Sequence, residues 1–181
     1  TCALPIFALE GVDVGIVARS KDRLEAAAKE LSAETKGRVI ALPCDVTNKS
    51  QVEAAVATAM SAFGSVDILV NSGSSPGGSA SAIGPIETVV DDDLLMDFNT
   101  KYLGAVRFAR AVLPHMKNKK WGRIINISGT NARNAGNLSG GARNASMVHM
   151  TKTLAVQYGR YGITVNCVHP GTTRTERTAV V

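Results

Sequence analysis

The sequence predicts an α/β fold in which a doubly wound parallel sheet lies between two layers of helices, in three α/β/α layers. Short apolar runs rich in β-branched residues alternate with segments of helical period, which is the pattern of parallel strands joined by crossover helices. The strand-like runs are apolar on both faces, so we expect helices to bury them from above and below. With 181 residues, 45% of them hydrophobic, the chain is expected to form a single domain over residues 1–181.

The predicted strands, in chain order, are Val14–Ala18, Val39–Pro43, Val66–Asn71, Arg123–Ser128 and Ile163–His169. The predicted helices are Lys21–Ala33, Lys49–Phe63, about Asp91–Lys117 and about Gly141–Tyr158. The first helix carries its apolar residues on one stripe, and the second follows an Asp-Val-Thr-Asn start signal. The segment Ser72–Gly84 is dense in Gly, Ser and Pro, which predicts a loop at the carboxyl edge of the sheet. Doubly wound sheets bind their ligands at that edge.

Composition excludes several classes of protein. The net charge of +5 comes from scattered basic residues in a chain that is only 4% aromatic, which argues against a nucleic-acid surface. No window reaches the roughly 18 uninterrupted apolar residues of a membrane helix, and no secretory leader is recognisable, so we expect a soluble, cytoplasmic protein. The three cysteines have no metal-type spacing, so neither a disulfide framework nor a metal site is expected.

Four short motifs lie at or near the ends of the predicted strands. They are Asp45-Val46, Asn71-Ser72-Gly73, the run from Gly122 to Ser128, and the run from Tyr161 to Gly171. In this order and at these separations they resemble the short-chain dehydrogenase/reductase family, over about Ala8–Thr175. The resemblance implies a Rossmann-type fold and hydride transfer between a nicotinamide dinucleotide and a small-molecule carbonyl or alcohol substrate.

The resemblance also implies which positions hold the dinucleotide. They are Arg19, Ser20, Asp45, Val46, Asn71, Ser72, Gly73, Ile127, Pro170, Gly171 and Thr173. In the family the Asp45 position accepts a hydrogen bond from the adenine amino group, and the Pro170-Gly171 position lies beside the nicotinamide. Arg19 and Ser20 follow the first predicted strand, where a carboxylate would favour NAD and a guanidinium attracts a 2′-phosphate. NADP is therefore the expected cofactor, with NAD as the alternative.

The N-terminal part departs from the family pattern. The family opens with a strand and a glycine-rich turn that receives the pyrophosphate, whereas Thr1–Phe7 contains no glycine and carries Pro5. That family strand lies in the middle of the sheet, where proline removes a hydrogen-bond donor. We therefore expect further residues near the N-terminus and, because the family continues into a substrate lid, after Val181.

The catalytic positions depart as well. The family uses a tyrosine and a lysine four residues later on one helix face, and here the aligned positions hold Gly140 and Asn144. No Tyr-x-x-x-Lys pair exists in the sequence. The family serine aligns with Gly129, next to Ser128, and the family asparagine aligns with Lys101, two residues from Asn99. Ser128 and Asn144 are the catalytic candidates, and the sequence leaves Lys101 open as either a surface charge or a pocket base.

Three functions compete on this evidence. The first is an NADP-dependent oxidoreductase whose proton comes from another group or from water. The second is a catalytically inactive dinucleotide-binding protein that acts by binding or assembly, and the third is a lyase-like enzyme that uses the same pocket. Among possible replacements for the tyrosine, His169 at the nicotinamide end of a strand is favoured over His149, which points away from the Gly140 face, and over His115 at a solvated helix end.

The family resemblance implies a homodimer or homotetramer assembled through the helices near 99–117 and 141–158. The apolar residues expected to form this contact are Val106, Ala109, Val112, Leu113, Met147, Met150 and Leu154. Apolar faces of this size are costly to leave in contact with water.

Overall fold

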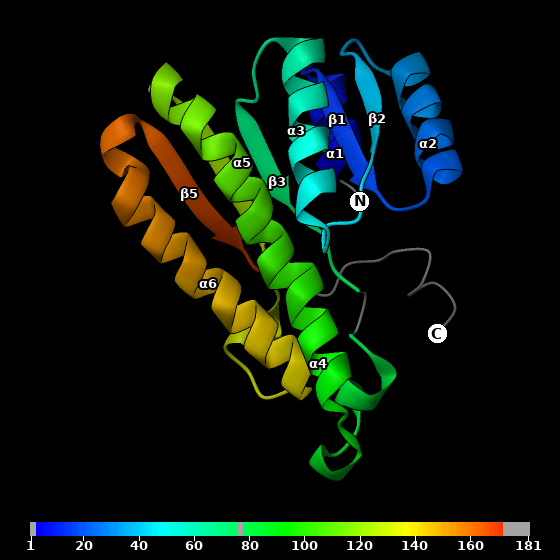
Figure 1. Ribbon diagram of the computed structural model, residues 1–181, viewed down its shortest axis with the longest axis vertical. Coiled ribbons are helices and arrows are strands. Elements are labelled where there is room, and N and C mark those ends of the chain that lie inside the picture. Colours follow the sequence, from blue (N-terminus) through cyan, green and yellow to red (C-terminus); the bar gives the residue numbers. More distant parts are fainter. Residues whose placement is uncertain (1–2, 76–77, 172–181) are drawn as a thin grey trace.

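The computed structural model describes residues 3–75 and 78–171 (Figure 1). The strands are β1 (Val14–Ala18), β2 (Val39–Pro43), β3 (Ile68–Asn71), β4 (Gly122–Ile127) and β5 (Ile163–Val168). The α-helices are α1 (Ala3–Leu9), α2 (Lys21–Glu34), α3 (Lys49–Phe63), α4 (Asp91–Phe98), α5 (Gly104–Lys119) and α6 (Leu138–Tyr158). Short turns of 3-10 helix occur at η1 (Ala80–Ile83), η2 (Ile86–Thr88), η4 (Thr130–Ala132) and η5 (Gly159–Tyr161), and a π-helix, η3 (Asn99–Leu103), joins α4 to α5.

The strands form two parallel sheets. β1 pairs with β2, with Val14 opposite Val39, and β4 lies between β3 and β5. In the part of the chain that the structure describes, no strand pairs with both β1 and β3, so each of these strands is the edge of its own sheet. Figure 1 shows the two sheets side by side, with α3 in front of them. The predicted α/β class with parallel strands is confirmed, and the sheet is divided.

Helix α3 joins the two halves of the core. Its Val56 packs in the cluster beneath α5 and α6, while its Val52 and Ala55 pack against Leu42 of β2. Helices α1 and α2 pack behind β1 and β2 around Ala8, so this sheet has helices on both faces. The cover expected on both faces is therefore present for β1 and β2.

The sheet formed by β3, β4 and β5 is covered differently. Helices α5 and α6 lie on one face, where Ile124 and Ile163 are fully buried. On β5 every second residue, Thr164, Asn166 and Val168, is exposed. Among the described residues, no helix shields these side chains, so the expectation of burial from both sides is wrong for this strand.

The predicted long helix Asp91–Lys117 is interrupted by η3. A π-turn holds one residue more per hydrogen-bonded ring than an α-turn, and periodicity of apolar residues over a long window does not reveal a single inserted residue. Such turns occur often at functional sites. Just after the interruption, Gly104 meets Val46, since a Cβ at Gly104 would lie 3.0 Å from the Val46 side chain. This close contact packs the start of α5 against the loop after β2.

Other boundaries differ by a few residues. Helix α6 begins at Leu138 because the Asn137 side chain accepts a hydrogen bond from the backbone N–H of Gly140, at 2.6 Å. The predicted loop Ser72–Gly84 contains the η1 turn. Ala8 lies in α1, and it is fully buried. Among the described helices, none combines the length and apolar character needed to cross a bilayer.

Most of the residues predicted to form the oligomer contact are buried in the core of the single chain. Ala109, Val112, Leu113, Met147 and Met150 are each at most 5% exposed and belong to the core between α5, α6 and the sheet. They are therefore unavailable to a second copy, and the prediction is wrong for these five residues. The apolar stripe of each helix faces its own sheet, which a helical wheel alone cannot distinguish from an intersubunit face.

Candidate active site

Polar side chains are buried where the ends of β3 and β4 face α6. The Asn71 amide nitrogen donates to Asn126 Oδ1 at 2.9 Å, and Asn126 Nδ2 donates to Thr151 Oγ1 at 2.9 Å. All three residues are at most 8% exposed. This series of buried hydrogen bonds links the ends of β3 and β4 to α6 and fixes the geometry of the carboxyl edge.

Ser128 and Asn144, the two predicted catalytic residues, are in contact. Ser128 Oγ donates to the Asn144 backbone oxygen at 3.0 Å, and both residues are buried. A third group joins them, because Lys101 Nζ donates to Asn144 Oδ1 at 2.6 Å and to the Ser128 carbonyl at 3.2 Å. The structure therefore brings one residue from η3, one from the end of β4 and one from α6 into a single cluster, which we call the Lys101 cluster.

Lys101 belongs to this site, and Asn99 does not. Asn99 Oδ1 accepts from Arg107 Nη2 at 2.8 Å, and Arg107 also donates to the Val46 carbonyl at 3.1 Å. Lys101 is only 8% exposed, so the surface-charge alternative is wrong. Burial, followed by repulsion from Arg143, lowers the pKa of Lys101 to about 8.

The spacing of apolar residues in the sequence carries a signal that Lys101 is buried. Ala105, Ala109 and Met116 mark the buried stripe of α5, and steps of four residues back along that stripe reach Lys101 and Asp97. A charged residue on a core-facing stripe is rare unless it has partners or a function. That position in the pattern distinguishes a buried lysine from a solvated one.

A second buried group flanks the cluster. Asp97 is 1% exposed and accepts from Ser139 Oγ at 2.6 Å and from the Ser79 backbone and hydroxyl at 2.8 and 3.0 Å. Burial acts to raise the pKa of Asp97, but these hydrogen bonds outweigh it and the pKa lies below the ordinary value. The carboxylate thus ties the segment after β3 to α4 and α6.

Arg143 approaches the same segment from α6. Its Nη1 donates to Ser74 Oγ at 3.0 Å and to the Ser75 carbonyl at 3.1 Å. Within the described residues, its buried Nε has no hydrogen-bond partner. Lys101 and Arg143 are two buried cations, with Asp97 as the buried carboxylate beside them. The local charge is therefore positive, which favours a ligand that carries or develops negative charge.

Gly140, at the position of the family tyrosine, is enclosed. A Cβ added there would lie 2.8 Å from Asn137 Oδ1 and 3.1 Å from Asn131 Nδ2. By contrast, a Cβ at Gly141 would meet only the Asn131 carbonyl, at an ordinary 3.6 Å. The first turn of α6 is therefore packed around a residue without a side chain.

Two of the three histidines are exposed to solvent. His149 and His115 are exposed on α6 and α5. His169, the favoured histidine, follows β5 and its Nδ1 lies 3.0 Å from the Gly129 carbonyl. This contact places the imidazole next to the residue that follows Ser128, at the carboxyl edge.

The loop after β2 holds Asp45 in a side-chain turn. Asp45 Oδ1 accepts from the Thr47 N–H at 2.9 Å and from Thr47 Oγ1 at 2.7 Å. These hydrogen bonds lower the pKa of Asp45, which is ionised at neutral pH. The prediction that Asp45 binds adenine is not tested by these contacts, which occupy one carboxylate oxygen.

The remaining predicted cofactor positions lie at strand ends. Arg19 is exposed after β1, and Ser20 is the N-cap residue of α2, with no hydrogen bond from its side chain to the helix. Pro170 and Gly171 are exposed after β5. The other predicted positions near this edge are Val46, Ser72, Gly73 and Ile127, and Thr173 lies outside the described residues.

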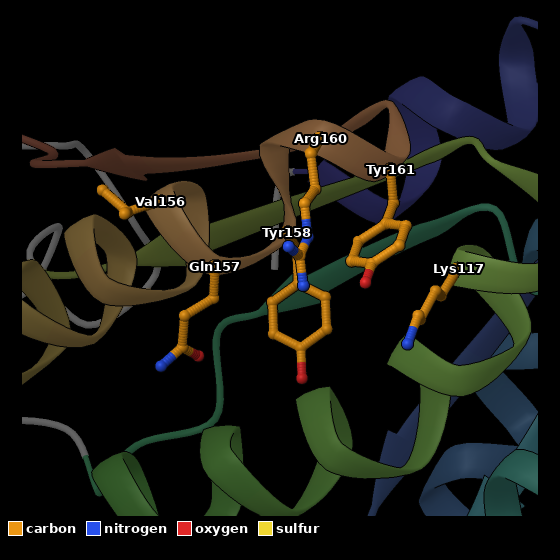
Figure 2. A pocket seen from close by; sticks show the side chains of 6 residues that line it. All are labelled: Lys117, Val156, Gln157, Tyr158, Arg160 and Tyr161. Atoms are coloured by element: carbon orange, nitrogen blue, oxygen red, sulfur yellow. The ribbon is translucent and has the colours of Figure 1, made fainter.

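A surface hollow occurs at the opposite end of α5 and α6 (Figure 2). It is lined by Lys117, Val156, Gln157, Tyr158, Arg160 and Tyr161. The Lys117 ammonium lies 4.6 Å from the centre of the Tyr161 ring. Because β4 and β5 begin just after these helix ends, the hollow lies at the amino edge of the sheet, away from the Lys101 cluster. Two of the three tyrosines in the sequence are therefore remote from the candidate site.

Comparison with known proteins identifies the class. The family model described as short chain dehydrogenase matches residues 5–181, so the chain belongs to the short-chain dehydrogenase/reductase family. A short-chain reductase protein, NovJ, from Streptomyces niveus is 35% identical, with 91% of this chain covering 61% of the relative.

Two solved structures are similar throughout the described fold. L-sorbose reductase from Gluconobacter frateurii, complexed with NADPH and L-sorbose, superposes with a TM-score of 0.88 at 31% identity, covering 96% of this chain and 65% of that one. An NAD⁺-bound xylitol dehydrogenase gives a TM-score of 0.87 at 25% identity, covering 97% of this chain and 66% of that one. The chain thus spans somewhat less than two thirds of the length of these proteins.

Proposed function

We propose that this protein is an NADP-dependent oxidoreductase that transfers hydride between the nicotinamide and a small carbonyl or alcohol substrate. The observation that carries the proposal is the Lys101 cluster, a buried, positively charged set of polar groups at the carboxyl edge of a parallel sheet. Ligands of doubly wound sheets bind at this edge. Membership of the short-chain dehydrogenase/reductase family supports the reaction class.

We assign the predicted cofactor positions to the parts of a dinucleotide. We assign the adenine end to Asp45 and Val46, the ribose to Asn71, Ser72 and Gly73, and the nicotinamide end to Ile127, Pro170, Gly171 and Thr173. When bound, the nicotinamide supplies or accepts the hydride, and the protein supplies position and electrostatics. Ser128 and Asn144, buried and mutually bonded, are the residues that we assign to orienting the substrate.

The choice of NADP over NAD rests on the turn after β1. Arg19, Ser20 and Lys21 place two cationic side chains and a hydroxyl group at the start of α2. Because the Ser20 hydroxyl makes no capping hydrogen bond, it is available to a phosphate oxygen. A guanidinium and a helix N-terminus both favour a 2′-phosphate, while NAD lacks that group.

The proposal includes a homodimer or homotetramer formed through the outer sides of α5 and α6. The five buried residues named above do not take part, whereas Val156 on α6 is 84% exposed. Light scattering at micromolar concentration checks this, and a monomeric mass would contradict it.

Two measurements test the activity. The quenching of protein fluorescence by NADPH and by NADH gives the affinity for each nucleotide, and NADPH absorbance at saturating nucleotide reports turnover with a panel of ketones and aldehydes. We expect tighter binding of NADPH and measurable oxidation by at least one carbonyl. The enclosed Gly140 favours a second candidate, an inactive dinucleotide-binding protein. Binding of NADPH without oxidation by any panel member would support that candidate instead.

A further inference from the structure

We propose that Lys101 is the proton-donating residue of the candidate site, acting from η3 in place of a group on α6. This inference rests on the proposed oxidoreductase function. The role of this side chain is not defined by the sequence alone.

Within residues 3–75 and 78–171, the contacts around Lys101 orient its amine without pairing it with a carboxylate. An ammonium has three N–H bonds, and in the described part of the chain two of them donate to Asn144 Oδ1 and the Ser128 carbonyl. Both acceptors are neutral, so they orient the amine without fixing its proton as an adjacent carboxylate would. A purely structural buried lysine is usually paired with a carboxylate, and within the described residues no ion pair involves Lys101.

The backbone supports the same assignment. Lys101 occupies the middle of the π-turn Asn99–Leu103, where the helix between α4 and α5 changes its winding. In this turn Asn99 bonds to Arg107, while Lys101 reaches in the direction of β4 and α6. The π-turn therefore lets Asn99 and Lys101, only two residues apart, point to different partners.

The elements packed around η3 contribute several charged or titratable groups. Arg143 of α6 repels the ammonium, and Cys167 of β5 acts in the opposite direction. Asp97 of α4 is engaged by Ser79 and Ser139, and its charge acts mainly on Arg143. Arg107 of α5 is held by Asn99 and Val46, and His169 contacts the Gly129 carbonyl. The balance leaves the amine of Lys101 able to lose its proton near neutral pH, because burial lowers its pKa to about 8.

The step balances with the chemistry already proposed. In the reducing direction, an N–H bond of the Lys101 ammonium breaks and an O–H bond forms on the substrate oxygen. A reduced nicotinamide held at the carboxyl edge would supply the hydride for the carbonyl carbon. The neutral amine regains its proton from water, and before transfer the positive charge stabilises the oxygen as it becomes negative.

Two readouts test the inference. The first is the titration of Lys101 in the protein without nucleotide, followed by NMR of ¹³C-labelled lysine and assigned by loss of the signal in Lys101→Met. We expect a midpoint of about 8 rather than the ordinary 10.5. In Asn144→Asp a carboxylate replaces the amide oxygen that lies 2.6 Å from Nζ, and we expect the midpoint to rise.

The second readout is the pH profile of carbonyl reduction. The wild-type kcat/KM is expected to fall as pH rises through about 8, because the donor loses its proton. Lys101→Met should lower kcat/KM about 100-fold or more and remove the fall. Lys101→Arg, which does not titrate in this range, should also remove it, and circular dichroism establishes that both variants are folded. Lys152→Met, an exposed lysine on α6, is the matched control and should keep the wild-type profile.

The outcomes separate this inference from the proposed function. A midpoint near 10.5, or an unchanged pH profile in Lys101→Met, would overturn the role of Lys101 while carbonyl reduction by the wild type still supported the oxidoreductase. No reduction by the wild type, together with a midpoint of about 8, would overturn the reaction and the donor step with it. A midpoint of about 8 with a matching profile that is lost in Lys101→Met supports both.

Discussion

The pH dependence of stability gives a direct measure of what the burial of Lys101 costs the fold. A lysine whose pKa falls from 10.5 in the unfolded chain to about 8 in the folded protein binds fewer protons when folded than when unfolded over this interval. The free energy of unfolding should therefore rise with pH between about 8 and 10.5. One pKa unit corresponds to about 1.4 kcal/mol, so the gain between pH 7 and pH 10 should be about 2 to 3 kcal/mol.

Urea unfolding of wild type and Lys101→Met at pH 7, 8, 9 and 10 isolates this contribution, because other titrating groups are common to both proteins. We expect the wild type to gain about 2 to 3 kcal/mol relative to the variant over this range. At pH 7 the variant loses the buried charge but leaves Asn144 Oδ1 and the Ser128 carbonyl without their donor, so its stability there is expected to change little. A pH-independent difference between the two proteins would refute the reasoning.

Four further predictions follow from named contacts. Gly141→Ala should raise the free energy of unfolding by about 0.5 to 1 kcal/mol, whereas Gly140→Ala should lower it because its Cβ meets two asparagine side chains; equal effects in thermal unfolding would contradict this. Asp97→Asn should lower the free energy of unfolding in urea by about 1 to 3 kcal/mol. The stability of the wild type should decrease as the pH is lowered and the Asp97 carboxylate becomes protonated, below its ordinary pKa of 3.8. An acid transition shared by the variant would count against the assignment. Arg19→Glu should weaken NADPH binding at least about tenfold with little effect on NADH, and parallel losses for both nucleotides would argue against a phosphate contact. Because β1 and β3 pair with no common strand among the described residues, we propose that a further strand of the protein lies between them; an intact mass of 18.9 kDa, that of these 181 residues, would contradict it.

Much of the fold follows from local pattern. Strands β1 and β2 and helix α3 have the predicted bounds, because β-branched runs and a helix start signal are encoded within a few residues of sequence. The contact between Ser128 and Asn144 could also be anticipated, since Asn144 aligns with the family lysine and Ser128 lies next to the position of the family serine. In the described part of the chain, the segment around Phe7 is helix α1, and no strand pairs with both β1 and β3.

The rest depends on contacts between distant residues. The direction of Lys101 is set by the π-turn and by acceptors 27 and 43 residues away, which no short-range pattern reports. Asp97 and Arg143 hold the segment after β3 through serines, residues whose composition predicts only a loop. The choice between an intersubunit face and a core face for Val112 likewise depends on which side of α5 meets the sheet.

A structure of the protein with NADPH bound tests the central claim most directly. The account predicts the nucleotide along the carboxyl edge of the strands, with its adenine end at Asp45, its ribose beside Asn71 and its nicotinamide beside Gly171, facing the Lys101 cluster. Binding of NADPH at any other surface, with this edge left to solvent, would contradict it.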